Sequence, residues 1–288
     1  MKIPLTVIIP CKNERIHIAD AIASVQDLAD EIIIADNGST DGTLEIVREI
    51  GGCKIIEREF IGYANFKNWA IPQAKNEWVL VLDADERMTP KLAEEIRTLL
   101  TGKPEFDAYR MQREVFFLGH RIYYSGWNTS YITRLLKRDK CRYKFTRAHE
   151  EIETKGITVG HLQGVLLHYT AQDLMAFMSK QLRYARLGGE DLAEAGQKPN
   201  YLYMFCLLPV KFFYYYILRG GILDGYAGLV LSVIMSSYTF LKSARLWELT
   251  DETCLADARE TERRQKASIR EMAAVAKPKP DDPARRAA

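Results

Sequence analysis

The first hundred residues alternate between short apolar runs and amphipathic stretches, and this alternation limits the fold more than any other feature of the chain. Residues 5–9, 31–35 and 78–82 are apolar runs of strand length. The stretches between them carry apolar residues at helical spacing. Because continuous apolar strands that alternate with helices are typical of a sheet covered on both faces, we expect an α/β fold with a mostly parallel sheet flanked by helices.

The later chain changes character twice. Residues 106–170 are richer in aromatic and β-branched residues, which predicts strands and loops that extend the same sheet, and residues 172–195 again have a helical pattern. From Tyr201 the chain is strongly apolar and aromatic, and it is charged after residue 249. We therefore divide it into a domain at 1–197, an apolar helical segment at 198–249, a charged helix at 250–275 and a disordered tail at 276–288.

Composition excludes several classes of protein. The 288 residues are 47% hydrophobic and 27% charged, as in a globular domain, and a net charge of +2 gives no basic field for nucleic acid. The five cysteines are scattered without a CxxC pair, which argues against a zinc site or a disulfide framework and favours a reducing, cytosolic setting. The apolar run near the N-terminus is short and predicts a strand rather than a signal peptide.

Acidic residues follow three of the expected strands. Glu14 comes after the first, Asp36 closes the second, and Asp83 and Asp85 close the strand that begins at Trp78. Ligands of open parallel sheets bind at these carboxyl ends. Two carboxylates two positions apart in extended chain lie on one side, where they can hold Mg²⁺ or Mn²⁺ together with phosphates. A solvated acidic turn is the alternative, but the convergence of these residues favours a metal-diphosphate site.

Three longer segments resemble the successive motifs of the family-2 inverting glycosyltransferases, which have the GT-A fold. They are VIIPCKNE, IIIADNGSTDGT and NFKNWAIPQAKNEWVLVLDADE. The later segments RAHEEI, LLHYT and LRGGILDGYAG resemble a bacterial subgroup that includes lipopolysaccharide core β-glucosyltransferases. The resemblance implies a GT-A fold, a nucleotide-sugar donor (usually UDP-linked) and dependence on Mn²⁺ or Mg²⁺.

The resemblance also implies roles for residues that bind the donor. Pro10, Asn13 and Glu14 belong to the loop that lines the base and ribose pocket in the family, and Asp36 matches the acid that hydrogen-bonds the nucleobase. Lys67 stands where the family commonly has arginine and is expected to contact phosphate, although an exposed helix lysine is the alternative. A lysine would bind as a point charge rather than as a bidentate fork.

The central motif divides its work between two acids. We expect Asp85 to be the main metal ligand, while Asp83 faces the ribose or reaches the metal through water, and Ala84 between them belongs to the donor site. The resemblance implies that His168 is a further metal ligand, and imidazole suits Mn²⁺ better than Mg²⁺. A core or capping histidine is the alternative for His168.

An inverting transfer to a hydroxyl needs a base, and Glu150 matches the family's base motif, with Glu151 as the fallback. A surface acidic pair is the alternative for both. We expect the acceptor to be a lipid-anchored glycan such as lipopolysaccharide core. A polyprenyl-phosphate glycosyl synthase, whose acceptor phosphate needs no base, and a catalytically silent nucleotide-sugar binder remain alternatives.

The apolar segment suggests a membrane partner. Residues 201–218 are long enough to span a bilayer but contain Pro209 and Lys211, and residues 226–241 are short for a span. Aromatic helices with cationic edges suit the surface of an anionic membrane. We expect peripheral attachment to the cytoplasmic side of the inner membrane, in preference to a buried core, a homo-oligomer contact or true spans.

Overall fold

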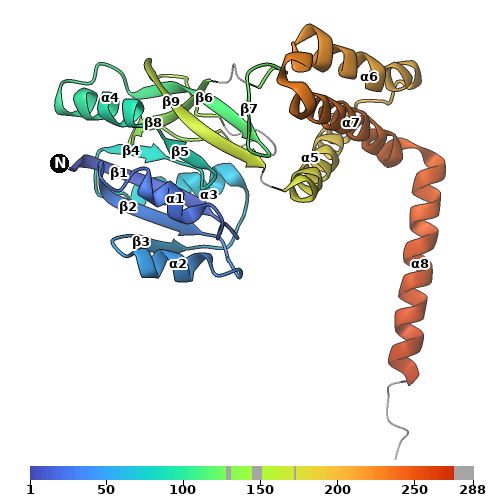
Figure 1. The fold of residues 1–288 in the computed structure, drawn as a ribbon. Coiled ribbons are helices and arrows are strands. Elements are labelled where there is room, and N and C mark those ends of the chain that lie inside the picture. Colours follow the sequence, from blue (N-terminus) through green and yellow to red (C-terminus); the bar gives the residue numbers. More distant parts are fainter. Residues whose placement is uncertain (128–130, 145–150, 172, 276–288) are drawn as a thin grey trace, which may run out of the picture.

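A nine-stranded sheet organises the first two thirds of the protein. The computed structural model describes residues 1–127, 131–144, 151–171 and 173–275. The order of the strands is β3-β2-β1-β4-β8-β6-β9-β5, and β7 pairs with β6 outside this path. The expected α/β class, with a central sheet flanked by helices, is confirmed (Figure 1).

The first half of the sheet is parallel, as the sequence predicts. It consists of β1 (Ile3–Cys11), β2 (Ala29–Asp36), β3 (Lys54–Glu57) and β4 (Trp78–Val81). β1, β2 and β4 are largely buried because helices cover both of their faces, whereas the edge strand β3 is partly exposed. The helices α1 (Ile18–Ala23), α2 (Thr43–Ile50) and α4 (Pro90–Thr101) pack on one face, and α3 (Tyr63–Ala70) with the short η1 (Ile71–Gln73) packs on the other.

The residues at positions 89 and 90 fix the start of α4, because threonine is a preferred N-cap and proline a preferred first helical residue. The helix begins at Pro90, and Thr89 is its N-cap, with the Oγ1 atom of Thr89 accepting a hydrogen bond from the backbone N–H of Leu92 at 3.3 Å. The same hydroxyl donates to the backbone oxygen of Val165 at 2.8 Å. One side chain therefore caps α4 and ties it to the sheet.

The second half of the sheet is mixed. Its strands are β5 (Glu86–Met88), β6 (Ala108–Phe117), β7 (His120–Ile122), β8 (Tyr131–Lys137) and β9 (Val159–Ala171). The pairs β4/β8, β6/β8, β6/β7 and β5/β9 are antiparallel, and only β6/β9 is parallel. The sheet is thus less uniformly parallel than the first hundred residues suggest, because the chain after α4 returns through hairpin-like connections without crossover helices.

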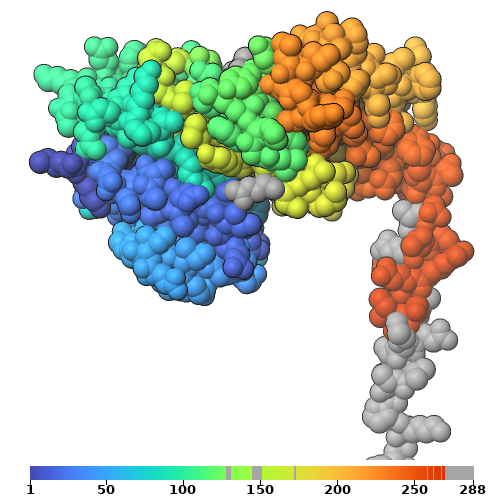
Figure 2. Space-filling model, in the orientation of Figure 1, coloured from blue at the N-terminus to red at the C-terminus, as the bar shows by residue number. Residues whose placement is uncertain are grey.

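Helices after residue 173 form a separate layer at one end of the sheet (Figure 1). They are α5 (Leu174–Glu194), α6 (Tyr201–Phe213), the π-helical turn η2 (Tyr214–Leu218), η3 (Gly221–Asp224), α7 (Gly225–Thr250) and α8 (Glu252–Val275). A small apolar cluster joins α5 and α7 to the ends of β6, β7 and β9. In Figure 2, α8 projects away from the rest of the molecule.

Two adjacent glycines let α5 and α7 approach closely. A Cβ atom on Gly189 would lie 2.6 Å from the Cβ of Arg245 and 3.0 Å from the backbone oxygen of Lys242, which is closer than real atoms pack. A Cβ on Gly188 would meet only side-chain carbons of Lys242, at 3.0 Å or more. The contact between the two helices therefore depends on Gly189 more than on Gly188.

We expect Gly189→Ala to lower the free energy of unfolding by about 1–3 kcal/mol, because the methyl group forces α5 away from α7. The matched variant Gly188→Ala should be neutral or more stable by up to about 1 kcal/mol, since alanine favours a helix and the Lys242 side chain can move. Urea denaturation of both variants measures the difference. Equal stability of the two variants would contradict this account of the packing.

Candidate active site

A cavity of about 820 Å³ opens at the carboxyl ends of β1 and β4 and is walled by α5 and α7. We call it the cleft. The two strands are neighbours, with Ile8 opposite Val81, so the loops that follow them open at the same edge of the sheet. The predicted site residues that line the cleft are Pro10, Glu14, Lys67, Asp83, Ala84, Asp85 and His168.

Strand pairing places His168 beside the central acidic motif. β5 follows directly after Asp85 and runs antiparallel to β9, with Glu86 opposite His168. The backbone N–H of Tyr169 also donates to the backbone oxygen of Asp85 at 2.9 Å. As a result, the Nε2 atom of His168 lies 3.2 Å from the Oδ2 atom of Asp85. Both side chains are mostly buried, with 11% and 18% of their surface exposed.

This pair of side chains fits a divalent cation. Two ligand atoms of one octahedral ion lie roughly 3 Å apart, which matches the separation of the Asp85 and His168 atoms. A carboxylate combined with an imidazole suits Mn²⁺. Among the described residues no group of three His, Cys, Asp or Glu side chains could hold a metal. Any ion held here would therefore take its other ligands from phosphate and water.

Asp83 is held by two cations instead. Lys67 Nζ donates to its Oδ1 atom at 2.9 Å, and Arg134 from β8 donates to its Oδ2 atom. Burial opposes ionisation of Asp83, but Arg134 and Lys67 outweigh it and hold the pKa of Asp83 well below its usual range. The side chain of Lys67 is only 4% exposed, so the alternative of an exposed helix lysine is wrong.

The acids in the floor of the cleft differ in the direction of their pKa shifts. Burial raises the pKa of Asp85, but His168 more than offsets this and, with Lys180, keeps that pKa well below its usual range. Glu14 behaves differently, because burial and the nearby Asp85 raise its pKa to about 7, while Lys180 opposes the rise. The surroundings therefore favour the charged forms of Asp83 and Asp85 and disfavour that of Glu14.

Asn13 and Asp36 do not line the cleft, but they hold the neighbouring loop, whose Asn37 does. Asp36 is 1% exposed, and its Oδ2 atom accepts hydrogen bonds from the backbone N–H groups of Gly38 and Ser39 at 2.8 and 2.9 Å. Asn13 has a positive φ of 58°, and its side chain accepts from the N–H of Thr40. Both side chains fix the loop 37–40, and the expected bond from Asp36 to a nucleobase stays a prediction.

Only one of the two candidate bases lies among the described residues. Glu150 lies outside the described residues, so its role stays a prediction. The side chain of Glu151 is 72% exposed and does not line the cleft. Its Oε2 atom lies 3.8 Å from the Nζ atom of Lys144. The structure therefore gives no support to the fallback.

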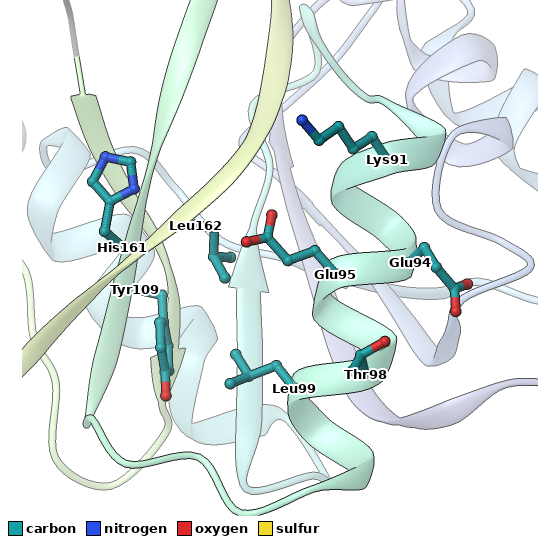
Figure 3. Close-up of a pocket in the computed structure, with 8 residues that line it drawn as sticks. All are labelled: Lys91, Glu94, Glu95, Thr98, Leu99, Tyr109, His161 and Leu162. Atoms are coloured by element: carbon teal, nitrogen blue, oxygen red, sulfur yellow. The ribbon is translucent and has the colours of Figure 1, made fainter.

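A second hollow, of about 690 Å³, lies against α4 at the far end of the sheet from α5 and α7 (Figures 1 and 3). Figure 3 shows the carboxylates of Glu94 and Glu95 pointing in different directions. The two carboxylate oxygens of Glu95 accept hydrogen bonds from the backbone N–H groups of Gln163 and Gly164, at 2.8 and 2.7 Å. Because the acids do not converge and one is structural, this hollow does not compete with the cleft.

The sequence from residue 6 to residue 162 matches the family model described as glycosyl transferase family 2, and this match covers more than half of the chain. The chain belongs to glycosyl transferase family 2. It is a glycosyltransferase, and the resemblance stated from its motifs is confirmed. The matched region runs from within β1 to the start of β9 and contains the acidic motif at the floor of the cleft.

Relatives of known sequence extend the likeness beyond the family model. The lipopolysaccharide core biosynthesis glycosyltransferase LpsC of Rhizobium meliloti is 28% identical over 252 residues, which are 86% of this chain and 93% of the relative. An uncharacterized glycosyltransferase of Rickettsia prowazekii, RP128, is 27% identical over 249 residues, with 83% and 85% coverage. This coverage is long enough to include α5 and α6, so these helices belong to the region shared with the two relatives.

A solved structure shares the fold. The mannosyltransferase PcManGT from Pyrobaculum calidifontis, solved with GDP-Man and Mn²⁺, superposes with a TM-score of 0.50 at 18% identity, covering 86% of this chain and 88% of that one. This likeness supports the GT-A architecture of the family-2 chain.

Several residues at the cleft are not evident from sequence reasoning. Arg134 is 2% exposed and pairs with Asp83 and, at 2.7 Å, with Glu86, whose side chain is fully buried. The signal available was a charge inside the apolar run of β8, since such a charge is almost never buried without a partner. Lys180 and Tyr238 reach the cleft from α5 and α7, which no local motif indicates.

Replacing Arg134 with Met should lower the free energy of unfolding by about 3–5 kcal/mol, because the buried Glu86 loses its closest cation and Asp83 loses one of two. Arg121→Met is the matched control: its partner Glu114 lies 2.6 Å away, but the pair is partly exposed and should contribute no more than about 1 kcal/mol. Chemical denaturation compares them, and similar losses in both would refute a buried charge cluster.

Proposed function

We propose that this glycosyltransferase moves a sugar, with inversion, from a nucleotide-diphosphate donor of the UDP-sugar type to a hydroxyl of a lipid-anchored glycan such as lipopolysaccharide core. The observation that carries the proposal is the Asp85–His168 pair in the same cleft as Lys67 and Asp83. The family relative named for lipopolysaccharide core biosynthesis supports the acceptor, and a neighbour solved with GDP-Man and Mn²⁺ supports a metal-bound nucleotide sugar.

The chain's own residues divide the work as follows. Asp85 and His168 hold the divalent ion, which when bound neutralises the diphosphate of the donor. Lys67 and Arg134 fix Asp83 at the floor of the cleft, where its free surface can accept a hydrogen bond from the ribose. As the acceptor oxygen bonds to the anomeric carbon, the bond from that carbon to the phosphate oxygen breaks, and Glu150 takes the acceptor's proton.

The experiment compares two variants that interrupt different steps. Asp85→Asn should abolish the Mn²⁺-dependent thermal stabilisation by nucleotide sugars and lower turnover by about 10²-fold or more. Glu150→Gln should keep the stabilisation and lose turnover by about 10²- to 10⁴-fold. Asp139→Asn, which removes an exposed carboxylate, is the control and should match the wild type.

Each other outcome points to a different alternative. Full turnover by Glu150→Gln with a phosphate acceptor would favour a polyprenyl-phosphate glycosyl synthase. Donor binding without turnover in the wild type, with any acceptor, would indicate a silent nucleotide-sugar binder. Absence of stabilisation by every nucleotide sugar tested with Mn²⁺ would refute the proposed function altogether.

We further propose that the protein attaches to the surface of an anionic membrane through α6, η2 and η3. This apolar surface carries exposed side chains from three consecutive elements; they are Tyr201, Leu202, Tyr203, Phe205, Leu208, Val210, Phe213, Ile217, Leu218, Ile222 and Leu223. Lys198, Lys211 and Arg219 lie in or beside it. Asp224, the single acid between residues 198 and 226, is turned inward and accepts from the backbone N–H groups of Tyr123 and Tyr124.

Packing favours a position on the membrane over a span through it. Both Tyr201–Leu218 and Gly221–Thr250 are long and apolar enough to span by length and composition alone. However, α7 contributes Met235 and Tyr238 to the cleft, and Arg245 of α7 pairs with Glu190 of α5 at 3.3 Å. Because of these contacts, α7 belongs to the protein body. The apolar surface that remains for lipid is formed by α6, η2 and η3.

Wild-type protein should sediment with vesicles that contain phosphatidylglycerol and bind less as salt is raised, because cations contribute to the attachment. The double variant Leu202→Glu, Phe205→Glu should lose most of this binding, since it puts two charges in the apolar surface. Ile50→Glu, at the end of α2, is the control and should bind as the wild type does. Unchanged sedimentation of the double variant would exclude this surface.

A further inference from the structure

Part of the cleft wall comes from outside the region that matches the family model. That region ends at residue 162, yet Lys180, Gln181, Arg183 and Tyr184 of α5 line the cleft, together with Met235 and Tyr238 of α7. The helices α5 and α7 are therefore part of the cleft wall, and α5 supplies its charged residues.

Packing at both ends of α5 fixes which face it turns to the cleft. Phe177 is 2% exposed and packs edge-on against Phe117, while Gly188 is buried against Lys242 of α7. These two positions lie three helical turns apart on one face, and Lys180 and Tyr184 lie between them on the same face. Lys180 is thus held toward the protein interior rather than toward solvent.

Among the described residues, no carboxylate lies within ion-pair distance of Lys180. Two other cations that line the cleft do have such a partner: Lys67 bonds Asp83 at 2.9 Å, and Arg113 lies 3.8 Å from Glu86. The next cation along the helix, Arg183, has a neutral partner, since it donates to the hydroxyl of Tyr63 at 3.2 Å.

Lys180 lines the same cavity as Glu14, Asp85 and His168. It reaches this cavity from α5, whereas the other three side chains follow or belong to strands of the sheet. An anionic group that entered this space would meet Lys180 on one side and the Asp85–His168 pair on the other.

We propose that Lys180 binds the terminal phosphoryl group of the donor's nucleoside diphosphate and neutralises charge on it as it leaves. When the bond from the anomeric carbon to the phosphate oxygen breaks, its electron pair stays on that oxygen, so the diphosphate gains one negative charge. A cation already facing that position stabilises the leaving group without rearrangement. This inference rests on the proposed function, because it requires a diphosphate leaving group.

Isothermal titration calorimetry in the presence of Mn²⁺ tests the proposal. It compares the dissociation constants of UDP with UMP and of GDP with GMP. Lys180→Ala should weaken binding of the preferred diphosphate by about 10- to 100-fold, because a charged hydrogen bond is lost, and should leave the monophosphate within about twofold. Lys180→Arg should recover part of the loss. Arg186→Ala is the control, since this exposed cation lies on the same helix but does not line the cleft.

The outcomes separate this inference from the proposed function. Failure of the wild type to bind either diphosphate would overturn both. Binding by the wild type with no loss in Lys180→Ala would overturn the inference alone. A normal diphosphate affinity combined with a raised KM for the acceptor would also overturn it, because Lys180 would then bind an anionic group of the acceptor.

Discussion

The antiparallel pairing of β5 with β9 is the constraint on which the cleft depends. β5 is only three residues long, yet it begins directly after Asp85 and sets Glu86 opposite His168. Two residues that are 83 positions apart in the chain thereby come within 3.2 Å through backbone hydrogen bonds alone. Strand register therefore brings the two proposed metal ligands together without the rearrangement of a loop.

The buried charges beneath this pair have a supporting role. Arg134 reaches from β8 to both Asp83 and Glu86, and Lys67 reaches Asp83 from α3. Because each unpaired buried charge would be costly, the three elements can pack only with these side chains together. Both acids of the central motif line the cleft, but Asp83 is bound by Lys67 and Arg134, whereas Asp85 lies against His168.

Sequence alone anticipates the parts of this protein that depend on local pattern. The strands β1, β2 and β4, the cap at Thr89 and the gathering of Glu14, Lys67, Asp85 and His168 all follow from periodicity or from motifs. Features that depend on distant packing do not. The burial of Lys67 is decided by Asp83 and the ring of Tyr143, and the mixed half of the sheet by short connections whose direction no periodicity reveals.

The helix α7 contacts three parts of the protein: the cleft, α5, and α6 with η3. Its side chains line the cleft, its contact with Gly189 seats α5, and through η3 it carries the apolar surface of α6. An ordinary lipid anchor can be exchanged for another of similar hydrophobicity, because only its apolar length matters. Here the proposed attachment surface is packed on α7, so exchanging it would also disturb a wall of the cleft. Substitutions in α7 would therefore act on the cleft and on the seating of the proposed attachment surface together.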